Sequence, residues 1–495
     1  MVTSRLISKV TLMLMLVVSS FAQAKNGNVF LERSFWKSAP DVETVKQKIE
    51  EGNDPIAKNG NAFDGATYAI LQDAPLATIE YMTSLEGNSV NKLTHDGRTY
   101  IFWAAYRSNL PVVKMLLAKG AKLDIVDTHG NSALTFAATN GVTNTEIYDV
   151  LIEGGADVKF TDHHGANALL LAAASDKDFA LMNYFTGKGL DVKAKDNDGN
   201  SAFNYAARTG NIDMMEQLVK AGVEYKGLNK EGGNAMLFAA RGTRNASNGI
   251  EVYKYLEKKG VKPNVVTNEG TTPLHLLAGR SEDMEVLKYF IKKGVNPNQV
   301  DADGNNALMI SASRNKLMVV ELFAKETKDI NAVNKKGETA LNNAVAGNTS
   351  EVVNFLLSEG AKTNDLTGKA LIDSYRKGED KELQAKLASI YSEDFNPSGV
   401  HADGNTLLHY AAEKDDLELT KMALNWEMDI NAKNDEGNTA LLIAAMKASN
   451  TEVLQFLMDN GADASIKTDF EESAYDLASE NELLTEANAD INFLK

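Results

Sequence analysis

The sequence predicts an all-α solenoid of about thirteen helix-turn-helix repeats with short β-hairpin fingers, preceded by an N-terminal signal peptide. Three observations predict the repeats. A glycine recurs at intervals of mostly 32 to 35 residues, a residue able to cap a helix follows two places later, and a pair of small residues comes soon after. A fixed period in this range is typical of stacked helix pairs.

The N-terminal segment carries a separate pattern. Arg5 and Lys9 accompany an apolar run from Val10 to Val18, and Ala22-Gln23-Ala24 follows. This pattern is typical of a secretory signal peptide, with cleavage expected after Ala24. The alternative, an uncleaved membrane anchor, needs about 20 apolar residues to cross the bilayer, and this run is shorter. Residues 1–24 are therefore expected to direct export to the periplasm, and the mature protein is expected to lack a membrane span.

Composition excludes several functions. With no Cys, the chain forms no disulfide, thiolate metal site or cysteine nucleophile, which suits an oxidising compartment. Its 51 Lys and Arg against 68 Asp and Glu give a formal net charge of −17. Such a surface repels nucleic-acid phosphates, so nucleic acid is not expected as a partner. The same charge keeps a long array soluble and unassociated, and we expect a monomer.

Each repeat is predicted from a fixed set of positions. The landmark glycines are Gly65, Gly97, Gly130, Gly165, Gly199, Gly232, Gly270, Gly304, Gly337, Gly404 and Gly437. The capping residues are Thr67, Thr99, Ser132, Asn167, Ser201, Asn234, Thr272, Asn306, Thr339, Thr406 and Thr439. A first helix then carries the small pair, as in Ala104-Ala105, where neighbouring helices must approach closely.

The second helix of each repeat has one apolar face. Apolar residues stand at i, i+1, i+4 and i+5, as in Val112, Val113, Leu116 and Leu117, so that face should be buried. The helix ends where a left-handed residue is needed. The closing glycines at these ends are Gly120, Gly155, Gly189, Gly222, Gly260, Gly294, Gly360 and Gly461.

The unit resembles the ankyrin repeat. The T-P-L-H box of that family is best preserved at Thr272-Pro273-Leu274-His275, and Asp429-Ile430-Asn431-Ala432 resembles its linking stretch. The chain as a whole resembles exported, periplasmic bacterial ankyrin-repeat proteins. The expected divisions are 1–24 signal peptide, 25–64 N-terminal capping repeat, 65–364 ankyrin repeats, 365–402 degenerate repeat or joint, 403–469 ankyrin repeats, and 470–495 C-terminal capping helices. In 365–402, Gly368 is followed by Ala370, which cannot cap.

Nothing in the sequence supports catalysis. It contains no phosphate-binding Gly-rich loop ending in Lys-Ser or Lys-Thr, no nucleophile elbow and no paired histidines of a zinc hydrolase. No enzyme activity, cofactor or metal is therefore expected. The resemblance implies a periplasmic scaffold or regulatory subunit. Such a protein would hold a protein partner, whose identity the sequence does not tell, in a concave groove of fingers and first-helix ends.

Cationic and aromatic residues occupy the predicted groove. Tyr106, Arg107, Arg208, Arg241, Arg280 and Arg314 fall at first-helix ends, and His95, His129, His163 and His164 fall in the fingers. Arg is favoured at recognition surfaces, although basic residues are also common at this position in the family. Neighbouring fingers should lie about 8–10 Å apart, so the fingertip histidines are expected to be solvated. The resemblance implies that His275 and His409 bridge backbone groups between repeats.

Two other functions stay open. The protein could be an accessory or protective factor for a periplasmic metallo- or redox enzyme, with the fingertip histidines as contacts. It could instead bind a polysaccharide, which would require clustered exposed aromatic side chains. Tyr100, Phe102, Trp103 and Tyr106 form the dense aromatic cluster of the sequence, and some of these must belong to the core.

Overall fold

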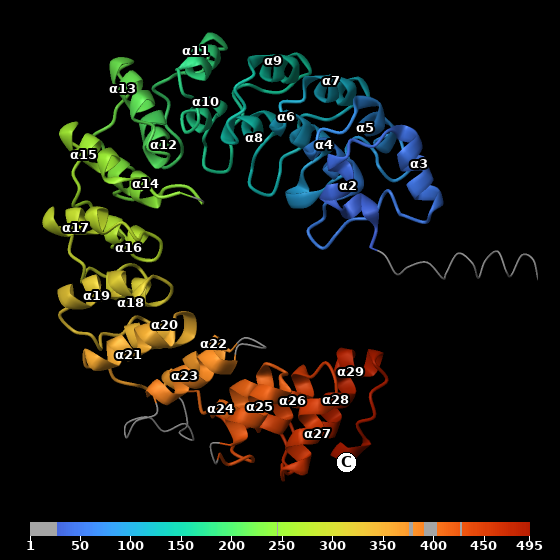
Figure 1. The fold of residues 1–495 in the computed structure, drawn as a ribbon, viewed down its shortest axis with the longest axis vertical. Coiled ribbons are helices and arrows are strands. Elements are labelled where there is room, and N and C mark those ends of the chain that lie inside the picture. Colours follow the sequence, from blue (N-terminus) through green and yellow to red (C-terminus); the bar gives the residue numbers. More distant parts are fainter. Residues whose placement is uncertain (1–26, 245, 376–379, 391–402, 426–427) are drawn as a thin grey trace, which may run out of the picture. The chain divides into compact units, whose positions relative to one another are not determined.

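The computed structural model describes residues 27–244, 246–375, 380–390, 403–425 and 428–495. It divides into two compact units, one ending at Lys262 and the other beginning at Pro263, which are described separately (Figure 1). This boundary lies inside the range 65–364 that is predicted as one run of repeats. The predicted signal peptide, residues 1–24, lies outside the described residues. Within the described ranges, no helix has the length and apolarity that a membrane span requires.

The first unit is a stack of helix pairs. It begins with the short elements η1 (Val29–Leu31), α2 (Arg33–Lys37) and α3 (Val42–Glu50). The first helices of the following pairs are α4 (Gly65–Leu71), α6 (Tyr100–Tyr106), α8 (Ala133–Thr139), α10 (Ala168–Ala172), α12 (Ala202–Arg208) and α14 (Ala235–Arg241). Their second helices are α5 (Leu76–Met82), α7 (Leu110–Ala118), α9 (Thr145–Glu153), α11 (Ala180–Gly187), α13 (Ile212–Lys220) and α15 (Ile250–Lys258). Each first helix packs on the next first helix.

The second unit repeats this arrangement. Its first helices are α16 (Pro273–Ala278), α18 (Ala307–Ala312), α20 (Ala340–Gly347), α22 (Thr367–Ser374), α24 (Leu407–Glu413), α26 (Ala440–Lys447) and α28 (Ala474–Glu480). Its second helices are α17 (Met284–Lys292), α19 (Leu317–Glu326), α21 (Ser350–Ser358), α23 (Asp380–Ile390), α25 (Leu417–Leu424), α27 (Glu452–Asp459) and α29 (Glu482–Glu486), and η3 (Asn492–Leu494) follows. The predicted all-α stack of helix pairs is confirmed.

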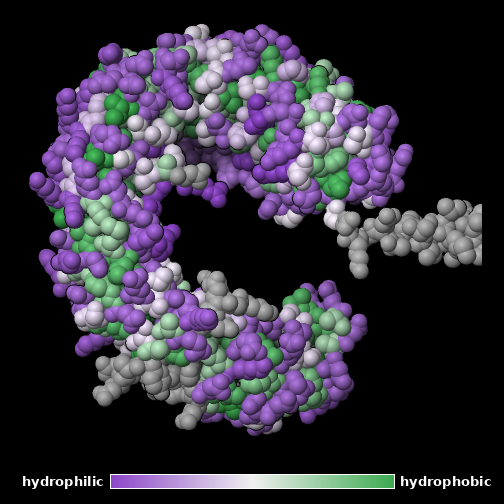
Figure 2. Space-filling model, viewed as in Figure 1, coloured by the Kyte–Doolittle hydropathy of each residue, from purple (hydrophilic) through white to green (hydrophobic). Residues whose placement is uncertain are grey.

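The core of each unit lies between the two helix layers. The small pairs, such as Ala104-Ala105 and Ala206-Ala207, are fully buried, as close helix contact requires. Second helices contribute one apolar face, and in α7 the residues Val112, Val113 and Leu116 are buried. On the side shown in Figure 2, hydrophilic residues cover most of the surface and hydrophobic residues form separate small areas. The predicted amphipathic pattern is therefore confirmed.

Helix caps agree with the sequence at most repeats. Ser132, for example, accepts a hydrogen bond from the backbone of Thr135 at the start of α8. The prediction for the first repeat is wrong, because Asp64 caps α4, while Gly65 and Thr67 lie inside that helix. Ala62, with φ of 60°, takes the left-handed turn position expected of Gly65. In this repeat the left-handed turn position therefore falls at Ala62, a non-Gly residue, and not at the predicted landmark Gly65.

The fingers are tight turns and not the predicted β-hairpins. In the described residues, only isolated bridges occur, such as Lys195 with Ser201, because each turn is too short to form a ladder. Backbone bonds connect neighbouring fingers at several junctions, as from the amide of Lys335 to the carbonyl of Asp303 at 2.9 Å. The finger glycines adopt the left-handed region, and at Gly130 an added Cβ would lie 2.4 Å from the ring of His163.

One repeat of the second unit lacks its finger. The connection from α21 to α22 has eight residues, 359–366, whereas those from α17 to α18 and from α19 to α20 have 14 and 13. Gly368 lies inside α22, and the side chain of Leu366 lies 3.6 Å from the Cβ position of Gly337 in the preceding finger. The helix stack nevertheless continues, because α20 packs on α22 and α22 on α24. The shortened connection lies mostly before the range 365–402 that is predicted as a degenerate repeat or joint, whereas α22 lies within that range.

His275 and His409 hold neighbouring repeats together. The Nδ1 atom of His275 interacts with the amide and hydroxyl of Thr272, and its Nε2 lies 3.1 Å from the carbonyl of Asn305 in the next finger. His409 makes the equivalent contacts with Thr406 and Asn438. The bridging role implied for both histidines is confirmed. Burial lowers the pKa of each imidazole, although the backbone contacts oppose this shift.

These pKa shifts predict acid sensitivity of the second unit. Because the pKa of each folded histidine lies below its unfolded value of about 6.5, the stabilisation is complete above that value. It is lost as the pH falls through the lower folded pKa. Hydrogen exchange of segments 267–280 and 403–413 should therefore accelerate between pH 7 and pH 5, after correction for the intrinsic rate. The His275→Asn/His409→Asn variant should lose this extra acceleration, and an unchanged pH dependence in that variant would contradict the assignment.

Candidate functional site

The structure places the five predicted arginines at one recurring position, the C-terminal end of a first helix. Arg208 and Arg241 are the last residues of α12 and α14, and Arg107 caps the end of α6. In the second unit, Arg280 and Arg314 follow the ends of α16 and α18. All five side chains are exposed. Each unit thus carries guanidinium groups on its first-helix layer.

Neighbouring groups orient these arginines. Arg107 forms an ion pair with Asp73 of the preceding repeat, and Nε of Arg208 donates to the carbonyl of Gly242 at 3.0 Å. The guanidinium of Arg241 lies 5.8 Å from the ring centroid of Phe238. Nε of Arg314 lies close to Gly279, the residue that ends α16. A Cβ atom added to Gly279 would be 3.1 Å from this nitrogen. Such contacts hold the arginine side chains in place. Less side-chain conformational entropy is therefore lost when a partner binds.

Two of the fingertip histidines, His95 and His129, share a carboxylate, whereas His163 and His164 lie in the next finger. The Nδ1 atom of His95 lies 2.8 Å from the carbonyl of Asn61, and its ring stacks on Phe63 with centroids 4.5 Å apart. His129 approaches Oδ2 of Asp96 at 3.2 Å, and His95 approaches the same oxygen at 3.4 Å. In the part of the chain that the structure describes, no group of three His, Asp or Glu side chains is arranged to hold a metal ion.

Asp96 is the centre of this fingertip group. Its backbone is left-handed, with φ of 56°, and its carboxylate also accepts from Nη1 of Arg98 at 3.0 Å. Burial alone would raise the pKa of Asp96. The charge of Arg98 and the hydrogen bond from His129 outweigh that effect and hold the pKa below its usual range. His163 and His164 are exposed in the next finger, where the carbonyl of His164 accepts from Asn197 at 2.8 Å. The four histidines therefore do not converge on one ligand.

A pocket of about 530 Å³ in the first unit brings some of the predicted residues together. The predicted residues His95, Tyr106 and Arg107 line it. Its other lining residues are Arg33, Phe63, Leu71, Gln72, Arg98, Trp103, Phe136 and Asn140. They come from successive repeats, so the pocket exists only when these repeats stack. Its size falls within the range of 300–1,000 Å³ typical of ligand pockets.

Arg98 organises the aromatic wall of this pocket. Its guanidinium lies 4.3 Å from the ring centroid of Phe136 and 5.3 Å from that of Trp103. Its Nε donates to the buried carboxylate of Asp127 at 2.8 Å. Such cation–π contacts are strongest where water is excluded. The wall combines apolar area with cationic groups, a combination found at the energetic centres of protein interfaces.

The sequence identifies only part of this wall. In the aromatic cluster, Tyr100 and Phe102 are fully buried and Trp103 is 5% exposed, whereas Tyr106 is 38% exposed. Phe136 has the same place in its repeat as Trp103, six residues after the landmark glycine and directly before the small pair. That recurrence was the available signal for Phe136. Nothing comparable marks Arg98, whose role depends on contacts with another repeat.

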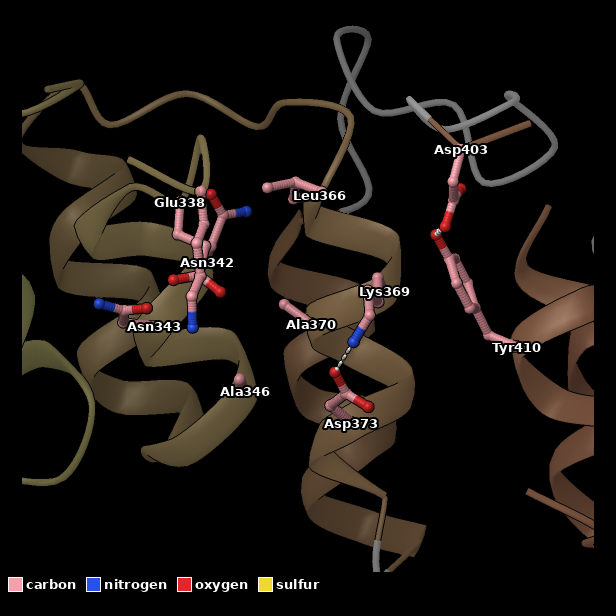
Figure 3. Close-up of a pocket in the computed structure, with 11 residues that line it drawn as sticks. Glu338, Asn342, Asn343, Ala346, Leu366, Lys369, Ala370, Asp373, Asp403 and Tyr410 are labelled. Carbon is pink, nitrogen blue, oxygen red and sulfur yellow. Dashed lines mark hydrogen bonds and ion pairs between the residues drawn. The ribbon is translucent and has the colours of Figure 1, made fainter. Parts of the chain in front are cut away.

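A second pocket, of about 420 Å³, lies in the second unit beside the missing finger (Figure 3). Lys369 and Asp373 point toward one another from α22, and Nζ of Lys414 lies 3.1 Å from the same carboxylate. The hydroxyl of Tyr410 donates to Asp403 at 2.7 Å. Burial would raise the pKa of Asp403, but the hydrogen bonds from Tyr410, from Asn405 and from the backbone together outweigh burial and lower it. The pocket is lined mainly by charged and amide side chains, unlike the aromatic pocket of the first unit.

Comparison with known proteins gives matches along most of the chain. The family profile described as "Ankyrin repeats (3 copies)" matches residues 66–162, 169–265, 243–334, 274–367 and 369–468. The "Notch-regulated ankyrin repeat-containing protein" of Xenopus tropicalis is 33% identical over 91 residues, which are 18% of this chain and 80% of that protein. The "E3 ubiquitin-protein ligase KEG" of Arabidopsis thaliana is 24% identical over 314 residues, covering 60% of this chain but 19% of the ligase. The human "Transient receptor potential cation channel subfamily A member 1" is 25% identical over half of this chain and 19% of its own length.

Proposed function

Because the chain belongs to the ankyrin-repeat family, whose repeats generally mediate contacts between proteins, we propose that it is a periplasmic scaffold or regulatory subunit. It binds a protein partner on the first-helix ends and the fingers. The observation that carries this proposal is the recurrence of exposed arginines at one helix position in a chain of net charge −17. Guanidinium groups make charge-assisted bonds with carboxylates, so the bound segment carries acidic residues.

The aromatic pocket gives this surface an anchoring point in the first unit. Trp103 and Phe136 form an apolar wall, and Tyr106 and Arg107 stand at its exposed edge. A few aromatic and arginine contacts supply most of the binding free energy in many interfaces. An apolar side chain of the partner fits against the wall of Trp103 and Phe136, and carboxylates beside it fit Arg107 at the exposed edge.

Polysaccharide binding has less support. It would need several open aromatic faces, and two members of the aromatic cluster, Tyr100 and Phe102, lie in the core. The activities in the names of the ligase and the channel are not proposed for this chain, because the similarity covers 19% of each of those proteins.

Removal of three arginines tests the proposal. The Arg208→Ala/Arg241→Ala/Arg280→Ala variant should capture less partner from periplasmic extract. Each exposed ion pair contributes only about 0.2–1 kcal/mol, so the three changes together should weaken capture by roughly tenfold at low salt. The difference should shrink as ionic strength rises. Circular dichroism should stay unchanged, with a small drop in melting temperature from the lost bond between Arg208 and Gly242.

The control removes the same charge from the other helix layer. Lys114, Lys220 and Lys288 are exposed on α7, α13 and α17, and their replacement by Ala should leave capture unchanged. Equal capture by the arginine variant and the wild type would place the binding face elsewhere on the chain.

Export is proposed from residues 1–24 alone. The cationic start, short apolar run and Ala22-Gln23-Ala24 predict cleavage before Lys25. Intact-mass measurement of protein recovered from its native cells should therefore show Lys25 as the first residue, in the periplasmic fraction. Recovery of the chain with Met1 in the cytoplasmic fraction would refute the periplasmic assignment.

A further inference from the structure

The pocket of about 530 Å³ in the first unit has no carboxylate among the lining residues that the structure describes. Its charged and amide side chains are Arg33, Gln72, His95, Arg98, Arg107 and Asn140. Carboxylates outside the lining already neutralise two of the arginines. Asp127 and Asp96 pair with Arg98. Asp73 pairs with Arg107. The positive charge that is left for a ligand is therefore that of Arg33.

Two donors at this pocket have no acceptor within the described residues. The guanidinium of Arg33 is exposed and makes no ion pair or hydrogen bond there, and the side-chain amide of Gln72 makes no hydrogen bond there. The guanidinium is oriented by the ring of Tyr68, whose centroid lies 5.5 Å away. Its helix, α2, is fixed by the fully buried Trp36, whose Nε1 donates to the carbonyl of Phe30 at 2.8 Å. A carboxylate of a ligand has two oxygens that can accept from these donors.

Aromatic side chains from successive repeats form the apolar part of the pocket. The ring of Phe63 lies 4.5 Å from that of His95 and 5.6 Å from that of Trp103, between centroids. The rings of Tyr106 and Phe136 are 5.9 Å apart. Trp103 and Phe136 are only 5% and 7% exposed, whereas Tyr106 is 38% exposed and Phe63 is half-buried. The ring surface open to a ligand therefore belongs mainly to Phe63 and Tyr106, and a further aromatic ring packs well against such surfaces.

We propose that this pocket binds an aromatic ring that carries a carboxylate. The ring packs against Phe63 and Tyr106, and the carboxylate accepts from Arg33 and Gln72. Two sources supply this chemistry. One is the C-terminal residue of a partner chain, which presents its α-carboxylate beside an aromatic side chain, and the other is a free aromatic acid. The inference rests on the proposed function for the first source alone, because a free acid requires no protein partner.

Small probes separate the contribution of the ring from that of the charge. N-acetylphenylalanine carries both groups, its amide lacks the charge, and N-acetylalanine lacks the ring. Their binding to the full-length mature protein would be followed by ligand-observed NMR titration, which detects weak binding. We expect saturable binding of N-acetylphenylalanine, about tenfold or more tighter than that of either other probe, since the charged pair and the ring contact both add affinity. Equal binding of either other probe, or no binding of N-acetylphenylalanine, would overturn the proposal.

Substitutions at the rim of the pocket test the assigned residues. Arg33→Gln and Tyr106→Ser should each weaken binding of N-acetylphenylalanine by roughly fivefold or more, because each removes one of the two contacts. Helicity should stay unchanged, since both side chains are exposed. The matched control is Lys37→Gln, which removes one charge from an exposed residue of α2 that does not line the pocket. This control should bind as the wild type does, and wild-type binding by Arg33→Gln or Tyr106→Ser would refute the site.

Two further ligands distinguish the sources. Tighter binding of the peptide Ala-Ala-Ala-Phe with a free C-terminus than of phenylpropionate identifies a chain end, and the reverse order identifies a free aromatic acid. Either order supports the shared chemistry. The triple arginine variant should bind all probes normally, since none of its three residues lines the pocket. Reduced partner capture by that variant, with no probe binding to the wild type, would therefore be a failure of this inference alone. Probe binding together with unchanged capture would be a failure of the arginine surface alone.

Discussion

Replacing Asp64 by Ala should reduce the free energy of unfolding of the N-terminal repeats by about 3–5 kcal/mol, the range for breaking a buried ion pair by removing one partner. Asp64 is fully buried. Its Oδ1 accepts from the amide of Thr67 at 2.8 Å, and its Oδ2 accepts from the hydroxyl of Tyr100 at 2.8 Å and lies 2.9 Å from Nζ of Lys92. The substitution therefore uncaps α4 and removes the buried carboxylate from the ammonium group of Lys92 and the phenol of Tyr100, which then share only the side-chain oxygen of Asn88.

Hydrogen exchange measured by mass spectrometry on segment 59–106 would check this effect. Protection there should fall most, because repeats contact only their neighbours. Asp64→Asn should be milder, since an amide oxygen still caps the helix. The matched control is Asp463→Ala, an exposed carboxylate that accepts from the amide of Ser465 at 2.9 Å. A loss below about 1 kcal/mol at Asp64 would mean that water replaces the carboxylate, and the buried network would then have no structural role.

Asn315→Ala should cause the second large loss, in the second unit. The amide nitrogen of Asn315 donates to the carbonyls of Ala278 and Ser281 in the preceding repeat, at 2.7 and 3.0 Å. Its oxygen accepts from the amide of Lys316 at 2.8 Å. Ala278 ends the first helix α16, and Ser281 and Asn315 lie in the turns between the two helices of their repeats. Asn315 is 5% exposed. Each buried carbonyl left without a donor costs about 1–3 kcal/mol.

Urea denaturation followed by circular dichroism would measure this loss. Asn460→Ala is the control, because the side chain of Asn460 is exposed and donates to the carbonyl of Phe456, a residue of the helix that Asn460 itself ends. Asn348 and Asn481 make the same kind of contact in later repeats, so their Ala variants should behave like Asn315→Ala. A loss at Asn315 no larger than that at Asn460 would show that the inter-repeat bonds add nothing to stability.

Local features of the sequence predicted most of the fold. Closing glycines such as Gly120 and Gly294 have φ of 86° and 85°, as expected from the need for a left-handed residue. The small pair and the apolar face of each second helix also predicted burial correctly. The first repeat was misassigned because Ala62 replaces glycine at its turn, so Gly65, three residues later, resembled the landmark. Gly368 concealed the missing finger in a similar way, since it lies inside a helix.

Part of the candidate site could not be predicted from the sequence, because it is formed by contacts between different repeats. The arginines recur at one helix position, so periodicity was enough to find them. Arg98 could not be found this way, because its contacts with Asp127 and Phe136 require a second repeat to stack on the first. The pocket beside the missing finger could not be found either, since it depends on a connection, 359–366, that is shorter than those of the two preceding repeats. The inter-repeat asparagines were overlooked because Asn at a loop position usually indicates only a turn or a cap.

The absent finger also has an evolutionary consequence. Since α20, α22 and α24 stack across the shortened connection 359–366, the loss of a finger leaves the packing of its repeat in place. A shortened connection is therefore compatible with helix stacking at this place, where the finger does not supply a contact such as that between Asn305 and His275. A change in the length of one finger can thus alter the surface of its repeat while the neighbouring first helices keep their contacts.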